Sequence, residues 1–256
     1  KVSAIIRRQF PEAKIAVPVP NAIYAREQKY LDNEYFNQWV DALASNSDFY
    51  DAIVIHCYSD NGVDVETGHI PTYDTSLSIC FSHMDARFES TLEYLEEKFP
   101  NKPVWITEFG LGACPSGPLR RKFQANRSYA GALHNDLFLM KVLCSKRVQV
   151  AHWHSLAKFT WAKNKKKQAL PRKTNAATHF ELFAEAAKGA VSVVPVEITG
   201  AGFYQSTSPQ YHGAFPAVEA VFLEEADGRG RLLVVNKVNR AYQITDLTSE
   251  NGLKLT

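Results

Sequence analysis

Short apolar strands alternate with amphipathic helical segments over the first 190 residues, and this alternation is what most limits the fold. The predicted strands are residues 13–19, 52–58, 103–107 and 148–153. The predicted helices are residues 33–45, 85–99, 123–145 and 175–188, and Gly189 follows as a helix stop. Strands that alternate with helices imply βα units and a parallel sheet. We therefore predict an α/β fold for this part of the chain.

The pattern changes after Gly189, where short strands follow one another without helices. The predicted strands are residues 191–198, 217–223, 231–236 and 241–245. The Asp227-Gly228 pair between two of them predicts a hairpin. The β segment is too short for an independent sandwich, so we expect it to complete one with strands from elsewhere. These features divide the chain into a domain at 1–190 and β-sandwich strands at 191–256.

Three of the strands in the first part end in side chains suited to chemistry. Glu108 follows a buried strand, in the place where barrel enzymes keep their catalytic groups. His56 and Tyr58 end another strand and point to the same face, because they are two residues apart. Trp153 and His154 end a third strand. The ordinary alternatives are a solvated glutamate, a core tryptophan and a structural histidine.

These residues carry a resemblance to a known group of enzymes. The triplet His56-Cys-Tyr58, the run Ile106-Thr-Glu-Phe-Gly110 and Trp153 follow one another along the chain in the order of the ends of strands 6, 7 and 8 of retaining glycoside hydrolases. The chain resembles the C-terminal half of such an enzyme, with a (β/α)8 TIM barrel and an attached β-sandwich. Arabinofuranosidases, xylosidases, heparanase-like glucuronidases and agarase-type enzymes share that layout. The resemblance implies that this chain supplies about strands 5–8 of the barrel.

The resemblance also implies roles for the residues at the strand ends. Glu108 is the nucleophile that forms a covalent glycosyl-enzyme in a double displacement. Tyr58 hydrogen-bonds this carboxylate and keeps it ionised and oriented, and His56 contacts a sugar hydroxyl or the nucleophile. The apolar face of a sugar would stack on a platform of three side chains: Trp153, His154 and Trp161. The substrate is then a poly- or oligosaccharide with O-glycosidic bonds.

One departure from the family pattern is serious. Retaining hydrolysis needs a second carboxyl group about 5–5.5 Å from the first, usually a Glu after an Asn at the end of strand 4. The single Asn-Glu pair here, Asn33-Glu34, begins a helical segment and is interpreted as part of a helix cap. Four strands also cannot close an eight-stranded barrel. We therefore expect a missing N-terminal barrel half, in the same polypeptide or as a partner chain.

Two other classes of protein are alternatives. A non-catalytic carbohydrate-binding or structural protein derived from such an enzyme would keep the fold and the tryptophan platform without the acid/base. A serine-nucleophile α/β hydrolase is disfavoured, because the sequence has no Gly-X-Ser-X-Gly elbow.

Composition and charge limit the classes of ligand and partner that the chain is expected to bind. A net charge of +2 over 256 residues argues against nucleic acid, and no apolar run approaches the roughly 20 residues of a membrane span. No Cys-X-X-Cys or His-X-X-X-His spacing indicates a metal, and we expect no cofactor. The basic run Lys163–Lys167 beside Trp161 is either a solvated loop or a site that favours an anionic polysaccharide. The acceptor Asn126-Arg-Ser128 favours a secreted, extracellular protein.

Overall fold

The computed structural model describes residues 2–20, 22, 32–60, 72–112, 127–154, 173–205, 214–238 and 240–244. These residues form two compact units. The first comprises the described parts of 1–58, 84–109 and 145–154, and the second those of 59–83, 110–144 and 155–256. The division at residue 190 stays a prediction.

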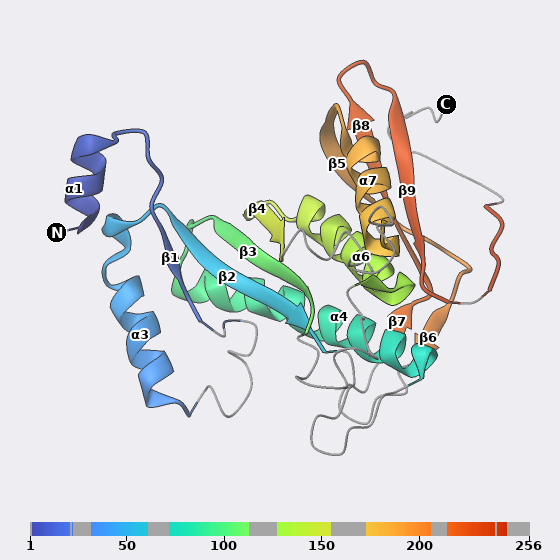
Figure 1. Cartoon of the computed structure of the whole chain (residues 1–256), viewed down its shortest axis with the longest axis horizontal. Coiled ribbons are helices and arrows are strands. Elements are labelled where there is room, and N and C mark those ends of the chain that lie inside the picture. Colours follow the sequence, from blue (N-terminus) through green and yellow to red (C-terminus); the bar gives the residue numbers. More distant parts are fainter. Residues whose placement is uncertain are drawn as a thin grey trace, which may run out of the picture. The chain divides into compact units, whose positions relative to one another are not determined.

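A four-stranded parallel sheet forms the centre of the first unit, as the sequence predicts. Its order is β1-β2-β3-β4 (Figure 1). The strands are β1 (Ala16–Pro18), β2 (Ala52–Ser59), β3 (Val104–Leu111) and β4 (Val148–Trp153). Apolar side chains alternate along β2 and β3, so that Ile53, Ile55, Val104 and Ile106 are almost fully buried. The fold is thus mixed α/β with a parallel sheet, while closure into a barrel stays a prediction.

Helices precede and follow these strands. The N-terminal helix α1 (Val2–Gln9), which the sequence analysis did not predict, comes before β1. Helix α3 (Glu34–Ala44) begins at Asn33, whose Oδ1 accepts a hydrogen bond of 2.9 Å from the N–H of Phe36. The Asn33-Glu34 pair is therefore a helix cap, as predicted. Phe36 in turn stacks on Tyr94 of α4 (Tyr73–Lys98), with ring centroids 6.4 Å apart.

Helix α4 begins at Tyr73, well before the predicted start at Asp85. Small polar residues in its first half hid the helical pattern, because they read as turn formers in the sequence. In the structure Ser78 and Ser82 are buried, and Ser82 donates its hydroxyl to the carbonyl of Ser78 over 2.7 Å, one helical turn earlier. Cys80 is a fully buried residue of this helix.

Arg147 fastens the start of β4 to the C-terminal end of α4. Its guanidinium donates to four backbone carbonyls at 2.6–3.2 Å: Leu92, Leu95, Phe99 and Lys102. It also forms an ion pair of 2.6 Å with Glu96. A cation at a helix C-terminus is stabilised by the helix dipole, and the planar fork of donors suits several carbonyls at once. One side chain therefore fixes the helix end, the turn after it and the last strand of the sheet.

Asp51 links the start of β2 to two residues nearer the N-terminus, Ile15 and Arg7. Its Oδ2 accepts a hydrogen bond of 2.8 Å from the N–H of Ile15, and its Oδ1 lies 3.2 Å from the guanidinium of Arg7. The backbone hydrogen bond from Ile15 lowers the pKa of the carboxyl group below its usual value, and Arg7 lowers it further. The ionised form is thus favoured in the folded state.

This preference predicts a pH-dependent loss of stability in Asp51→Asn. A depressed folded-state pKa contributes stability above the unfolded value near 3.8, and the contribution is lost as the pH falls through the folded-state pKa. We expect the variant to lose about 1 kcal/mol of unfolding free energy at pH 7, and to match the wild type well below pH 4. Urea unfolding at several pH values measures this. The matched control Asp48→Asn, on an exposed neighbour, should behave like the wild type. A loss of the same size at every pH, with no decrease as the pH falls below 3.8, would contradict the account.

The second unit contains an antiparallel sheet in the order β5-β8-β9 (Figure 1). The strands are β5 (Ala190–Val196), β8 (Val218–Glu225) and β9 (Gly230–Asn236). The predicted hairpin at Asp227-Gly228 is confirmed, and Gly228 adopts the positive φ of 80° that the turn requires. The predicted strand at 241–245 is wrong for its described part, since 241–244 have no strand structure.

Two helices and a small ribbon complete the second unit. Helix α6 (Tyr129–Cys144) packs on α7 (Asn175–Ala187) and contacts all three strands of the sheet (Figure 1). His179 of α7 joins Asp136 of α6 through a contact of 2.6 Å. The two-stranded ribbon of β6 (Phe203–Gln205) and β7 (Ala214–Pro216) was not predicted. Each of its strands is only three residues long, too short to show a periodicity.

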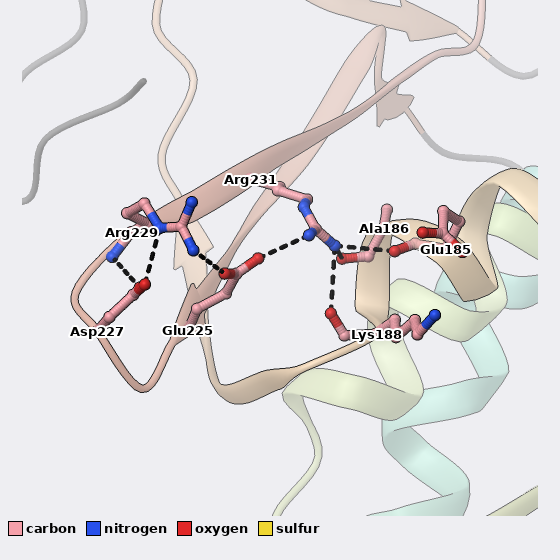
Figure 2. A network of polar contacts seen from close by, with 7 residues as sticks. All are labelled: Glu185, Ala186, Lys188, Glu225, Asp227, Arg229 and Arg231. Atoms are coloured by element: carbon pink, nitrogen blue, oxygen red, sulfur yellow. Dashed lines mark hydrogen bonds and ion pairs between the residues drawn. The ribbon is translucent and has the colours of Figure 1, made fainter.

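Arg231 of β9 anchors the C-terminal end of α7, as Figure 2 shows. Its Nη1 donates to the carbonyls of Glu185, Ala186 and Lys188 over 2.8, 3.0 and 3.2 Å. Its Nη2 forms an ion pair of 2.7 Å with Glu225 of β8. The hairpin of β8 and β9 is thereby tied to the end of the helix that leads into β5.

A buried ion pair lies just beyond β9. The side chain of Lys237 is 0% exposed, and its Nζ lies 2.5 Å from Oε1 of Glu219 on β8. The same ammonium group lies 5.1 Å from the ring centroid of Phe215 and 5.6 Å from that of Phe81. A buried charge needs both a counter-ion and a favourable surround, and here a carboxylate and two aromatic faces supply them.

Candidate active site

The site is built where three strands of the first unit approach their carboxyl ends. Tyr58 lies near the end of β2, Glu108 lies within the last half of β3, and His154 directly follows β4. In a parallel sheet these ends share one edge, which is the edge where α/β enzymes bind their ligands. The strand-end residues that the sequence analysis selected are therefore brought together.

Three side chains converge on one oxygen of Glu108. The hydroxyl of Tyr58 donates a short hydrogen bond to Oε2. Nδ1 of His56 lies 3.5 Å from the same oxygen, and Nε2 of His154 lies 3.8 Å from it. The Glu108 side chain is 31% exposed, so the carboxylate is partly covered yet open to solvent. This arrangement orients a carboxylate without enclosing it.

Burial and the neighbouring carboxylate keep Tyr58 protonated. Burial raises the pKa of the phenol well above its usual value, and the hydrogen bond to Glu108 and the negative charge of that residue raise it further. The hydroxyl is thus a permanent donor at any physiological pH. A carboxylate that accepts such a bond is held in its ionised form.

A β-bulge directs Glu108 toward this edge. Between the paired residues Ile106 and Phe109, β3 advances three residues while β4 advances two, from Ala151 to Trp153. Ile106 and Phe109 are both fully buried although they are three positions apart, an odd spacing that puts side chains on opposite faces of a regular strand. In a regular strand Glu108 would share the buried face of Ile106, because side chains alternate. The extra residue re-aims the carboxylate, as bulges near active sites do.

The remaining predicted residues have different outcomes. Trp153 is 9% exposed, which is the burial of a core side chain, and its role in a sugar-binding platform stays a prediction. Trp161 and the basic run at 163–167 lie outside the described residues, so the anionic-substrate preference also stays a prediction. Within the described ranges no group of three His, Cys, Asp or Glu side chains could hold a metal ion. No helix there is long and apolar enough to cross a membrane.

A second polar cluster, in the other unit, was not foreseen from the sequence. Nε2 of His134 lies 2.8 Å from the hydroxyl of Ser59, and its Nδ1 lies 3.3 Å from the amide oxygen of Asn135. His134 is 0% exposed, and burial lowers its pKa to about 4. The neutral ring therefore donates to the amide oxygen and accepts from the hydroxyl. Because all three side chains are buried, this is a hydrogen-bond network of the core.

Comparisons with known proteins give one distant similarity. No family model matches the chain, and no curated protein matches it. Among solved structures the chain is similar to a glycoside hydrolase family 44 endoglucanase produced by Clostridium acetobutylium ATCC 824, with 10% identity and a TM-score of 0.46. The match covers 88% of this chain and 47% of that enzyme, so the chain spans about half of its length. A similarity this distant does not establish a shared fold.

Proposed function

We propose that this chain carries the nucleophile of a retaining glycoside hydrolase. The observation that carries the proposal is the Tyr58–Glu108 hydrogen bond at the carboxyl edge of a parallel sheet. An oriented, partly exposed carboxylate is what attack on an anomeric carbon requires. The motifs around Glu108, Tyr58 and Trp153, in their chain order, support the same assignment.

The proposed reaction divides its roles between this chain and a group outside it. One oxygen of Glu108 attacks the anomeric carbon, the glycosidic C–O bond breaks, and a glycosyl-enzyme ester forms. A second carboxylic acid, outside this chain, protonates the leaving oxygen and later removes a proton from the attacking water. Tyr58 and His56 keep the Glu108 carboxylate in position during these steps. The proposal includes a barrel, which would bring the second carboxyl group to within about 5–5.5 Å of Glu108.

Trapping the covalent intermediate tests this function. A panel of 2,4-dinitrophenyl 2-deoxy-2-fluoroglycosides would be incubated with the full-length protein. The fluorine slows both formation and breakdown of the ester, while the good leaving group speeds its formation, so the ester accumulates. We expect a mass increase of one fluoroglycosyl group, located on the peptide that contains Glu108. A label on another carboxylate would overturn the assignment of the nucleophile. Glycan binding with neither turnover nor label would favour the non-catalytic carbohydrate-binding alternative.

A further inference from the structure

We propose that His134 of α6 is a positioning residue for Tyr58, acting through the hydroxyl of Ser59 at the end of β2. The inference rests on the proposed function for its catalytic meaning, because Tyr58 is the donor that holds the carboxylate of Glu108. The placement of the Tyr58 ring is measurable without any substrate, so the positioning role and the hydrolase activity are tested separately.

The side chain of Ser59 is fixed on the side of β2 opposite to that of Tyr58. Cys57 and Ser59 are 3% and 5% exposed, whereas Tyr58 between them is only partly buried, which is the alternation of a regular strand. The Ser59 hydroxyl donates to Nε2 of His134 over 2.8 Å. Because a slip or rotation of the strand end would move both side chains together, a fixed Ser59 limits the directions that Tyr58 can take.

The backbone of Ser59 is fixed as well, to the end of the strand that bears the carboxylate. Its carbonyl accepts a hydrogen bond of 2.6 Å from the N–H of Gly112, which directly follows β3. A Cβ atom at position 112 would lie 3.1 Å from that carbonyl oxygen, closer than an ordinary van der Waals contact, so glycine permits this approach. The last residue of β2 is therefore held through both its main chain and its side chain. Neither contact involves Glu108, so the place of Tyr58 is set independently of the carboxylate that it binds.

The imidazole of His134 is oriented so that it accepts the Ser59 hydroxyl. Its Nδ1–H donates to Oδ1 of Asn135 over 3.3 Å, which leaves Nε2 as the acceptor. The ring also stacks on Phe138, one helical turn later, with centroids 6.3 Å apart and 12° between the planes. Because His134 is 0% exposed and burial lowers its pKa to about 4, the ring is neutral near pH 7 and Nε2 keeps its lone pair for the hydroxyl.

Tyrosine labelled with 13C at Cζ reports the place of the Tyr58 ring by NMR, because the phenol signal responds to the charge of its hydrogen-bond acceptor. In the full-length protein Tyr58→Phe assigns the signal, and Glu108→Gln shows where it lies when the acceptor is uncharged. We expect Ser59→Ala and His134→Leu to move the Tyr58 signal toward its place in Glu108→Gln. His134→Gln, whose amide oxygen accepts the Ser59 hydroxyl, should keep the signal near its wild-type place.

Turnover of an aryl glycoside gives the catalytic readout. Ser59→Ala should lower kcat about five-fold, the factor that corresponds to one hydrogen bond, with KM little changed. In a His134→Leu background the same substitution should add nothing, because the bond is already absent. Ser82→Ala is the matched control, since it also removes a buried serine hydroxyl of the second unit, one that donates over 2.7 Å. It should lower the stability to a similar extent and leave both kcat and the Tyr58 signal unchanged.

An unchanged Tyr58 signal or an unchanged kcat in Ser59→Ala would overturn the proposal. So would an equal fall of kcat in Ser82→Ala, because a general loss of stability would then explain the effect. If the Tyr58 signal moves as expected but no fluoroglycosyl group is trapped on Glu108, the hydrolase is rejected while the positioning of Tyr58 by His134 stands.

Discussion

Glu108→Gln in the full-length protein is expected to lower kcat by about 10⁴-fold or more, the scale seen when a catalytic nucleophile is removed. An amide oxygen does not displace a glycosidic oxygen, so the covalent step is lost. The substitution keeps the size of the side chain, and the amide oxygen still accepts the hydrogen bond from Tyr58. The unfolding midpoint should therefore stay close to that of the wild type. Initial rates on aryl glycosides, together with thermal unfolding, measure both effects.

Two further variants make this prediction specific. Glu93→Gln, on an exposed helix position, is the matched control and should change neither the rate nor the stability. Glu108→Ala leaves space for a small anion, so azide should restore turnover and give a glycosyl azide of inverted configuration. Hydrolysis at the wild-type rate in Glu108→Gln would rule out Glu108 as the nucleophile.

Glu219→Ala is expected to lower the free energy of unfolding by about 3 kcal/mol, because it removes the carboxylate that lies 2.5 Å from the fully buried ammonium of Lys237. This expected loss is at the low end of the range for removing one partner of a buried ion pair, because the side chain of Glu219 is itself 22% exposed. Lys237→Met should cost far less. Methionine removes the charge, fills the space of the lysine stem and packs its sulfur against the rings of Phe215 and Phe81. Guanidinium-induced unfolding compares the two variants.

The double variant tests why Glu219→Ala should lower the stability more than Lys237→Met does. If an uncompensated charge is the cause, Glu219→Ala combined with Lys237→Met should be more stable than Glu219→Ala alone. Losses that simply add would show that packing, and not the charge, dominates. A larger loss in Lys237→Met than in Glu219→Ala would contradict the account altogether.

The parallel sheet was predictable because its strands are apolar runs with clear boundaries. The run before Glu108 and the run before Tyr58 are both bounded by polar or turn-forming residues, and each became a buried strand. The first half of α4 was not predictable in the same way. The buried Ser82 donates its hydroxyl to the helix backbone, and such a local hydrogen bond leaves no periodic signal in the sequence.

From the residues alone the candidate site was predictable only as a set of strand ends, and the hydrogen bond from Tyr58 to Glu108 was expected from the family resemblance. Chain order brought Tyr58, Glu108 and His154 to one edge, since parallel strands share their carboxyl ends. The contact between Tyr58 and Glu108 depends on strand register, and the direction of Glu108 depends on the bulge before Phe109. Register and bulges are set by pairing between distant segments, so no local pattern reveals them. For the same reason the approach of His154 to the carboxylate was missed.

The bulge in β3 has a consequence for how such a site can change over generations. The direction of the carboxylate depends on the number of residues between Ile106 and Phe109, and their identity matters much less. Substitutions there alter the chemistry of the side chain while its direction is inherited unchanged. Loss of the codon for Thr107 would instead place Glu108 directly after Ile106, on the opposite face of the strand, and would remove the bulge. Such a deletion would change the direction of the carboxylate while its chemistry stayed the same.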